Sequence, residues 1–148
     1  MAGFRVHKSI VDLPCEKVTI SSLAVTIGDL LELIPGEAST WTATTANSLN
    51  YSRKAIAMET VANTATSVLV QPLSGFELVA AESANDSAVA DNGNLMVLSD
   101  VNTVNNSHTT SASEKACFLQ TGTLGATTDK VILGHVMVGN SVDSDATA

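Results

Sequence analysis

Three histidines, His7, His108 and His135, are the side chains of this sequence best suited to act as a general base near neutral pH. Acyl transfer would need one of them within hydrogen-bond distance of a serine, threonine or cysteine nucleophile. The chain contains neither the Gly-x-Ser-x-Gly turn of hydrolases nor the Asp-Thr-Gly or Asp-Ser-Gly of aspartic proteases. We therefore expect His135, which lies in an apolar run, to be structural, and we expect no catalytic residues.

Two further segments carry fragments of binding motifs. The run from Gly122 to Lys130 contains glycines and a lysine, but a phosphate-binding loop needs its lysine directly after the second glycine and before a helix. We expect a turn between two strands there. Asp91-Asn92-Gly93-Asn94 lacks the other ligands of a calcium loop, and Asn-Gly favours a hairpin turn. Asp143 and Asp145 alone are too few for a metal site, so we expect no metal and no cofactor.

The net charge and the length of the apolar runs argue against nucleic-acid binding and against a membrane-spanning protein. The net charge of −8 and the sequence pI of about 4.6 oppose binding to nucleic acid, which requires clustered lysine and arginine. No apolar run reaches the ~18 residues that span a bilayer, and the N-terminus lacks a signal-peptide core.

Cys15 and Cys117 are expected to be reduced and buried, with a disulfide as the alternative. The acidic stretch 77–100 contains no lysine or arginine and is expected to be a solvated face.

The elements that would position any site are short strands. Apolar, β-branched segments bounded by glycine, proline, asparagine, serine or aspartate recur along the chain. They are Lys17–Ile20, Asp29–Ile34, Ser67–Gln71, Phe76–Ala80, Leu95–Leu98, Cys117–Gln120 and Lys130–Val138. This spacing predicts a mainly β fold, a small β-barrel or sandwich domain with long polar loops.

Several segments do not fit this pattern of short apolar strands. The stretch 53–66 is compatible with helix or strand, and we favour a strand over Ala55–Glu59. The polar stretches 39–50 and 102–114 predict surface loops. Gly134 interrupts an apolar strand and indicates a bulge or a close backbone approach. Aromatic residues make up only 3% of the chain, so burial between chains would add stability.

The order of these segments also resembles a known family. The similarity is carried by a Gly-Asp hinge before an apolar strand, and by a strand that ends in Gln-Thr-Gly, followed by an Ala/Thr/Gly turn and Asp-Lys-Val-Ile-Leu-Gly. The segments concerned are IGDLLEL (27–33), RKAIAMETV (53–61), VLVQPLSGFELVA (68–80), NLMVLSD (94–100) and ACFLQTGTLGATTDKVILGHVMV (116–138). Together they resemble the phage head decoration, or cement, proteins. The polar stretches 39–50 and 102–114 depart from the simplest members.

The resemblance implies a function without chemistry. Members of this family are small β-barrels that coat the outer surface of an assembled capsid, often as homotrimers, and lack enzymatic activity. The expected partner is the major capsid protein, with no nucleic acid, membrane or small-molecule substrate. The protein would be made in the host cytoplasm and act on the virion. We expect an N-terminal arm or leading strand (1–24), a β-barrel decoration domain (25–139) and an acidic tail (140–148).

The N-terminal segment 3–14 is the expected capsid-binding element, because it combines basic and apolar side chains in an otherwise acidic chain. The predicted contact residues are Phe4, Arg5, Val6, His7, Lys8 and Ile10. The segment can be an arm that crosses a neighbour or an integral first strand. The alternative function is a virion or cell-surface β-module that binds a receptor or glycan, with Trp41 and Tyr51 as the rings available for stacking on sugar.

Overall fold

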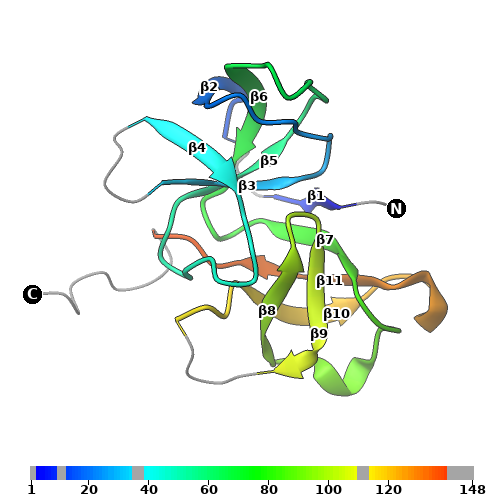
Figure 1. Ribbon diagram of the computed structural model, residues 1–148. Coiled ribbons are helices and arrows are strands. Elements are labelled where there is room, and N and C mark those ends of the chain that lie inside the picture. Colours follow the sequence, from blue (N-terminus) through cyan, green and yellow to red (C-terminus); the bar gives the residue numbers. More distant parts are fainter. Residues whose placement is uncertain (1–2, 10–12, 35–38, 110–113, 140–148) are drawn as a thin grey trace, which may run out of the picture.

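The computed structural model describes residues 3–9, 13–34, 39–109 and 114–139 and contains two β-structures, drawn one above the other in Figure 1. The helical elements among these residues are two single turns of 3-10 helix, η1 (Val89–Asp91) and η2 (Thr127–Asp129). The mainly β fold with a small barrel is thereby confirmed. No helix in the described part of the chain is long and apolar enough to cross a membrane.

The upper structure is a closed barrel with the strand order β2-β4-β3-β5-β6. Its strands are β2 (Glu16–Ile20), β3 (Leu30–Leu33), β4 (Thr40–Ala43), β5 (Lys54–Ala57) and β6 (Ser67–Pro72). Aliphatic side chains fill the interior, together with Trp41. The strand predicted over Ala55–Glu59 is confirmed as far as Ala57, where β5 ends, and β5 is buried along its whole length. Closure removes free strand edges from the barrel, while Leu30 and Ile56 of its strands belong to the hydrophobic core of the sheet and so join the two structures.

The lower structure is a six-stranded sheet with the order β1-β7-β11-β10-β8-β9. Its strands are β1 (Phe4–Lys8), β7 (Leu78–Ser83), β8 (Leu95–Asp100), β9 (Thr103–Thr109), β10 (Phe118–Thr123) and β11 (Val131–Val136). β9 also pairs in parallel with the end of β7, so the sheet curls back on itself. β1 and β9 therefore share one edge of β7, where β1 pairs with Leu78–Ala81 and β9 with Glu82 and Ser83.

Two strands lie in segments expected to be polar loops. β4 falls within 39–50 and β9 within 102–114. β9 alternates burial over its middle, where Val104 and the polar Asn106 are both buried. The Asn106 side chain accepts a hydrogen bond from the Asn85 N–H (2.9 Å) and donates to the carbonyl oxygens of Asn85 (3.1 Å) and Asp86 (3.0 Å). A polar residue can thus face inward because the neighbouring backbone supplies hydrogen-bond partners for its amide group.

The N-terminal segment forms an integral strand over Phe4–Lys8. β1 pairs antiparallel with β7, and the Phe4 ring packs against Phe118 with 6.5 Å between ring centroids. The Phe4 N–H donates to the Gly28 carbonyl (2.8 Å), so the Gly-Asp hinge joins β1 to the barrel. Gly28 adopts φ +94°, a conformation that favours glycine. Of the expected domains, residues 1–24 supply β1 to the sheet and β2 to the barrel, and the tail 140–148 lies outside the described residues.

The acidic stretch 77–100 does not form one solvated face. Glu77 is buried, and its carboxylate accepts hydrogen bonds from the backbone of Ser74 and Gly75. The Asn92-Gly93 pair is not a hairpin turn either, because it connects η1 to β8 and the strands on its two sides, β7 and β8, do not pair with each other. The expected turn within 122–130 is confirmed, since β10 and β11 form a hairpin around it.

Candidate functional site

The residues predicted to bind the capsid separate along β1. Phe4 was expected to dock into a partner, but it is 2% exposed and belongs to the core, because its side chain faces Phe118 across the sheet. Arg5 is exposed and Val6 half-buried, and both line a cleft against the barrel. His7 and Lys8 line a different hollow beyond it. Ile10 lies outside the described residues.

The cleft between β1 and the barrel has a volume of about 330 Å³. Two of its walls are exposed apolar side chains, Ile27 (56% exposed) and Met58 (38%). Arg5 and Gln71 supply polar groups at its margin. We call this set, Arg5, Val6, Ile27, Met58 and Gln71, the β1–barrel cleft. An apolar floor with a polar margin is typical of a surface that receives another protein.

The backbone of β1 adds hydrogen-bonding groups to this cleft. The Phe4 N–H points away from β7, since it donates to Gly28. Hydrogen-bonding directions alternate along an antiparallel strand, so the backbone N–H and C=O of Val6 point the same way as those of Phe4. The pairing with β7 shifts between Val6 and Lys8, which interrupts the regular ladder at His7 before it resumes at Lys8. The cleft therefore offers backbone groups beside apolar side chains.

The second hollow, lined by His7, Lys8, Ser9, Phe76 and Leu78, has a volume of about 620 Å³. Phe76 is 78% exposed at the turn between β6 and β7, although the sequence pattern predicted a strand there. The Ser74-Gly75 pair before it is the signal that identifies this turn from sequence. We call Lys8, Phe76 and Leu78 the Phe76 surface.

A buried lysine marks the junction between the barrel and the sheet. Lys54 on β5 is 1% exposed, and its Nζ donates to the carbonyl oxygens of Leu49 (2.7 Å), Ser52 (3.2 Å) and Met137 (2.8 Å), and to the Ser52 hydroxyl (2.9 Å). Burial lowers the pKa of Lys54, while Cys117 and Glu32 act in the opposite direction. Every contact is with a fixed acceptor, so this lysine serves structure.

Cys117 lies beside this lysine and is also unsuited to nucleophilic chemistry. Its thiol donates to the Ser48 carbonyl at 3.2 Å, and burial raises its pKa to about 11. A thiol that keeps its proton at neutral pH is a poor nucleophile. Both cysteines are free, but only Cys117 is buried as expected, since Cys15 is exposed.

The raised pKa of Cys117 predicts a specific dependence of stability on alkaline pH. The folded chain holds this proton up to about pH 11, whereas a solvent-exposed cysteine thiol loses it around pH 9.0. Its stabilising contribution is therefore complete below pH 9.0 and is lost as the pH rises through 11. We expect Cys117→Ala to lack this loss, so that its unfolding free energy relative to wild type rises by about 2–3 kcal/mol across that window. Urea titrations at successive pH values measure it, and parallel pH profiles would contradict the assignment.

Asp29, in the Gly-Asp hinge, is a buried carboxyl with a local structural role. It accepts a hydrogen bond from the Thr26 N–H at 2.9 Å. Burial raises its pKa and nearby Asp100 raises it further, whereas the Thr26 contact lowers it. These neighbours close the turn that carries Ile27 into the β1–barrel cleft, so the hinge positions the cleft.

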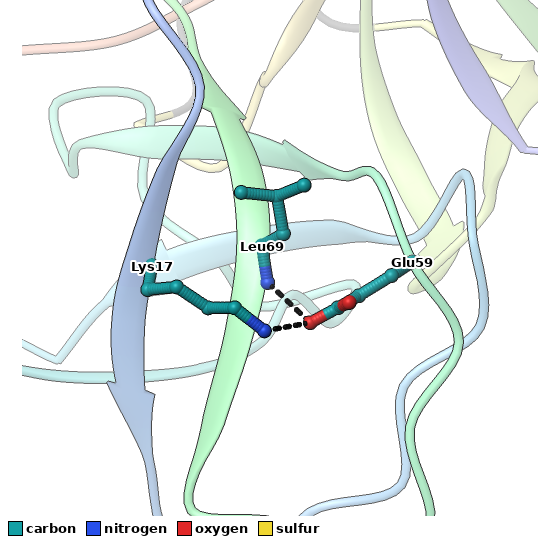
Figure 2. Close-up of polar contacts among 3 residues, drawn as sticks. All are labelled: Lys17, Glu59 and Leu69. Carbon is teal, nitrogen blue, oxygen red and sulfur yellow. Dashed lines mark hydrogen bonds and ion pairs between the residues drawn. The ribbon is translucent and has the colours of Figure 1, made fainter.

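Glu59 fixes the other side of the barrel. Figure 2 shows its carboxylate oxygen Oε1 between the Lys17 ammonium (2.6 Å) and the Leu69 N–H (2.9 Å). These hydrogen bonds lower the pKa of Glu59, with Lys17 the larger contribution. The three residues connect β2, β6 and the segment after β5. Glu59, which belongs to that segment, follows Met58 directly in the sequence. The arrangement thus supports one wall of the β1–barrel cleft.

Metal-binding side chains do not gather into a cluster in the part of the chain that the structure describes. His135 is structural as expected, since its Nδ1 lies 2.9 Å from the Glu77 carbonyl oxygen. Within the described ranges, no group of three or more His, Cys, Asp or Glu side chains could hold a metal ion. Trp41, a candidate for stacking on sugar, is only 8% exposed in the barrel core. Tyr51 remains exposed.

Comparison of the chain with models of protein families, with curated proteins and with solved structures finds no match.

Proposed function

We propose that this protein is a capsid decoration protein, which binds the outer surface of an assembled viral head and stabilises it by bridging subunits of the major capsid protein. The observation that carries the proposal is the β1–barrel cleft, where Ile27 and Met58 are exposed beside the outward backbone of β1. An extended segment of a shell subunit could bury these side chains and add hydrogen bonds along β1. The resemblance of the segment order to decoration proteins supports the same function.

In this proposal the protein has no enzymatic activity and acts as a homo-oligomer, with a trimer as the expected state. A shell repeats the same surface many times, so an oligomer that touches several subunits gains effective concentration from each weak contact. Its partners are the major capsid protein and other copies of itself, and its place is the outside of the virion. The glycan-binding alternative is less favoured, because Trp41 is buried and cannot stack on a sugar.

Exposed apolar residues of the cleft provide a direct test of capsid binding. We expect the double variant Ile27→Ser, Met58→Ser to fold normally but to bind capsids at least about tenfold more weakly, because truncating buried interface anchors costs about 1–2 kcal/mol or more. Cosedimentation with capsids stripped of decoration protein measures the affinity.

Tyr51→Ser is the matched control, since Tyr51 is 45% exposed and lies outside the residues that line the cleft. This control should bind like wild type. Failure of the wild-type chain to cosediment would overturn the proposed function, and unchanged binding of the double variant would remove the cleft from the binding site.

A further inference from the structure

Phe76 is the most exposed large hydrophobic side chain in the described part of the chain, and its turn is rigidly held. The buried Glu77 carboxylate accepts hydrogen bonds from the N–H groups of Ser74 (2.9 Å) and Gly75 (3.1 Å) and from the Ser74 hydroxyl (3.0 Å). The Phe76 N–H in turn donates to the Ser74 hydroxyl at 3.3 Å. A ring displayed on a fixed backbone loses little entropy on binding, which is the property of an interface anchor.

The surroundings of Phe76 indicate the chemistry of its partner. The exposed Lys8 and the half-buried His7 lie at the same hollow, and Leu78 extends the apolar area. The chain as a whole carries a net charge of −8, so this basic and apolar combination is unusual on its surface. A complementary partner surface must offer an apolar side chain flanked by carboxylates.

The chain itself carries such a surface at the opposite end of β7. Val89 on η1 is 69% exposed, with the exposed Asp86 before it and the half-buried Asp91 after it. Phe76 lies two residues before β7 and Val89 six residues after it, and β7 itself is roughly 20 Å long. One molecule therefore presents a basic apolar surface before β7 and an acidic apolar surface after it, and none of the described residues that line the hollow at Phe76 comes from η1.

We propose that the Phe76 surface of one copy binds the Val89 surface, Asp86, Val89 and Asp91, of a neighbouring copy. The contact joins two different surfaces, so it is head-to-tail and forms a ring when the rotation between copies closes. Phe76 packs against Val89, and Lys8 pairs with Asp86, which is the more exposed of the two aspartates. This inference rests on the homo-oligomeric part of the proposed function, and it uses surfaces separate from the β1–barrel cleft.

Sedimentation equilibrium of the full chain over a wide range of concentrations tests the contact. We expect wild type to form an oligomer and Phe76→Ala to dissociate at least about tenfold more readily. Lys8→Glu and Asp86→Lys should each weaken assembly through like-charge repulsion, and the chain that carries both should recover most of it, because the pair is restored in reversed polarity.

Ile27→Ser is the control, because it removes an exposed apolar side chain from the other surface and should leave the mass unchanged. A wild-type chain that stays monomeric at every concentration would overturn the inference, as would an oligomer insensitive to Phe76→Ala or a double charge reversal without recovery. Capsid cosedimentation is read separately. An oligomer that assembles through these surfaces and ignores capsids would contradict the proposed function while leaving this contact intact.

Discussion

Replacing Lys54 by alanine is expected to lower the unfolding free energy by about 3–5 kcal/mol, since each buried acceptor left without its donor costs about 1–3 kcal/mol. Lys54 is 1% exposed and donates to four oxygens, three of them backbone carbonyls. One of these, the Met137 carbonyl, follows β11 of the sheet, whereas Lys54 itself belongs to β5 of the barrel. The loss therefore loosens the junction between the two structures and is not confined to one strand.

Two further variants separate the origins of this effect. Lys54→Met keeps most of the side-chain volume and removes a charge that is expensive to bury, so we expect a smaller loss of about 1–3 kcal/mol. Arg53→Ala alters the exposed neighbour on the same chain segment and should change stability by less than about 0.5 kcal/mol. Chemical denaturation monitored by circular dichroism measures all three. A Lys54→Ala chain as stable as Arg53→Ala would show that the buried hydrogen bonds contribute little.

The lowered pKa of Lys54 gives the same site a dependence on pH. Its folded pKa lies below the 10.5 of a solvated lysine, so the unfolded chain binds this proton more tightly than the folded one does. Its contribution to stability is complete above the unfolded pKa and is lost as the pH falls through the folded pKa. Cys117 has the opposite slope, because its folded pKa is raised. Comparing variants at each site is necessary to separate the two.

The strands that could be located from sequence are those whose apolar residues indicate burial directly. β2, β3, β6, β8 and β11 lie within or close to their predicted ranges. β9 was missed because one of its inward-facing residues, Asn106, is polar. Asn106 can be buried only because it forms hydrogen bonds with backbone groups of Asn85 and Asp86, which lie near it only in the folded chain. Tertiary context, which local patterns do not contain, decides such strands.

The candidate site was predictable in position but not in its details. The basic and apolar character of 3–8 is visible in the sequence, and the structure places two clefts along β1. Which side chain faces the core is not visible, because the burial of Phe4 depends on Phe118, a residue near the other end of the chain. Met58 and Phe76 lie in segments that the sequence predicts as strands, whereas in the structure both lie outside strands and are exposed. Only the Ser74-Gly75 pair before Phe76 signals this from sequence.

Gly134→Ala is expected to destabilise the protein by at least about 3 kcal/mol, because overpacking at such a position forces backbone shifts in both strands. The sequence predicted a bulge or a close backbone approach at this glycine, and the structure confirms the close approach. A Cβ at Gly134 would collide with the Leu119 carbonyl group of β10 and with the Phe118 ring. The backbone oxygen cannot move aside without breaking the β10–β11 ladder, and Phe118 lies at the centre of the sheet's core.

Gly122 on the facing strand is the matched control for this substitution. It belongs to the same hairpin and pairs with Leu133, where the ladder shifts register between Gln120 and Gly122. A Cβ there would meet only the Leu133 side chain at 3.8 Å, an ordinary van der Waals distance, so Gly122→Ala should change the unfolding free energy by less than about 1 kcal/mol. Thermal unfolding of the two variants, measured side by side, distinguishes a steric clash at Gly134 from a general effect of replacing glycine in a strand. If both alanines destabilised the hairpin equally, the cause would be the loss of glycine from a strand, and the close approach of β10 to Gly134 would contribute little.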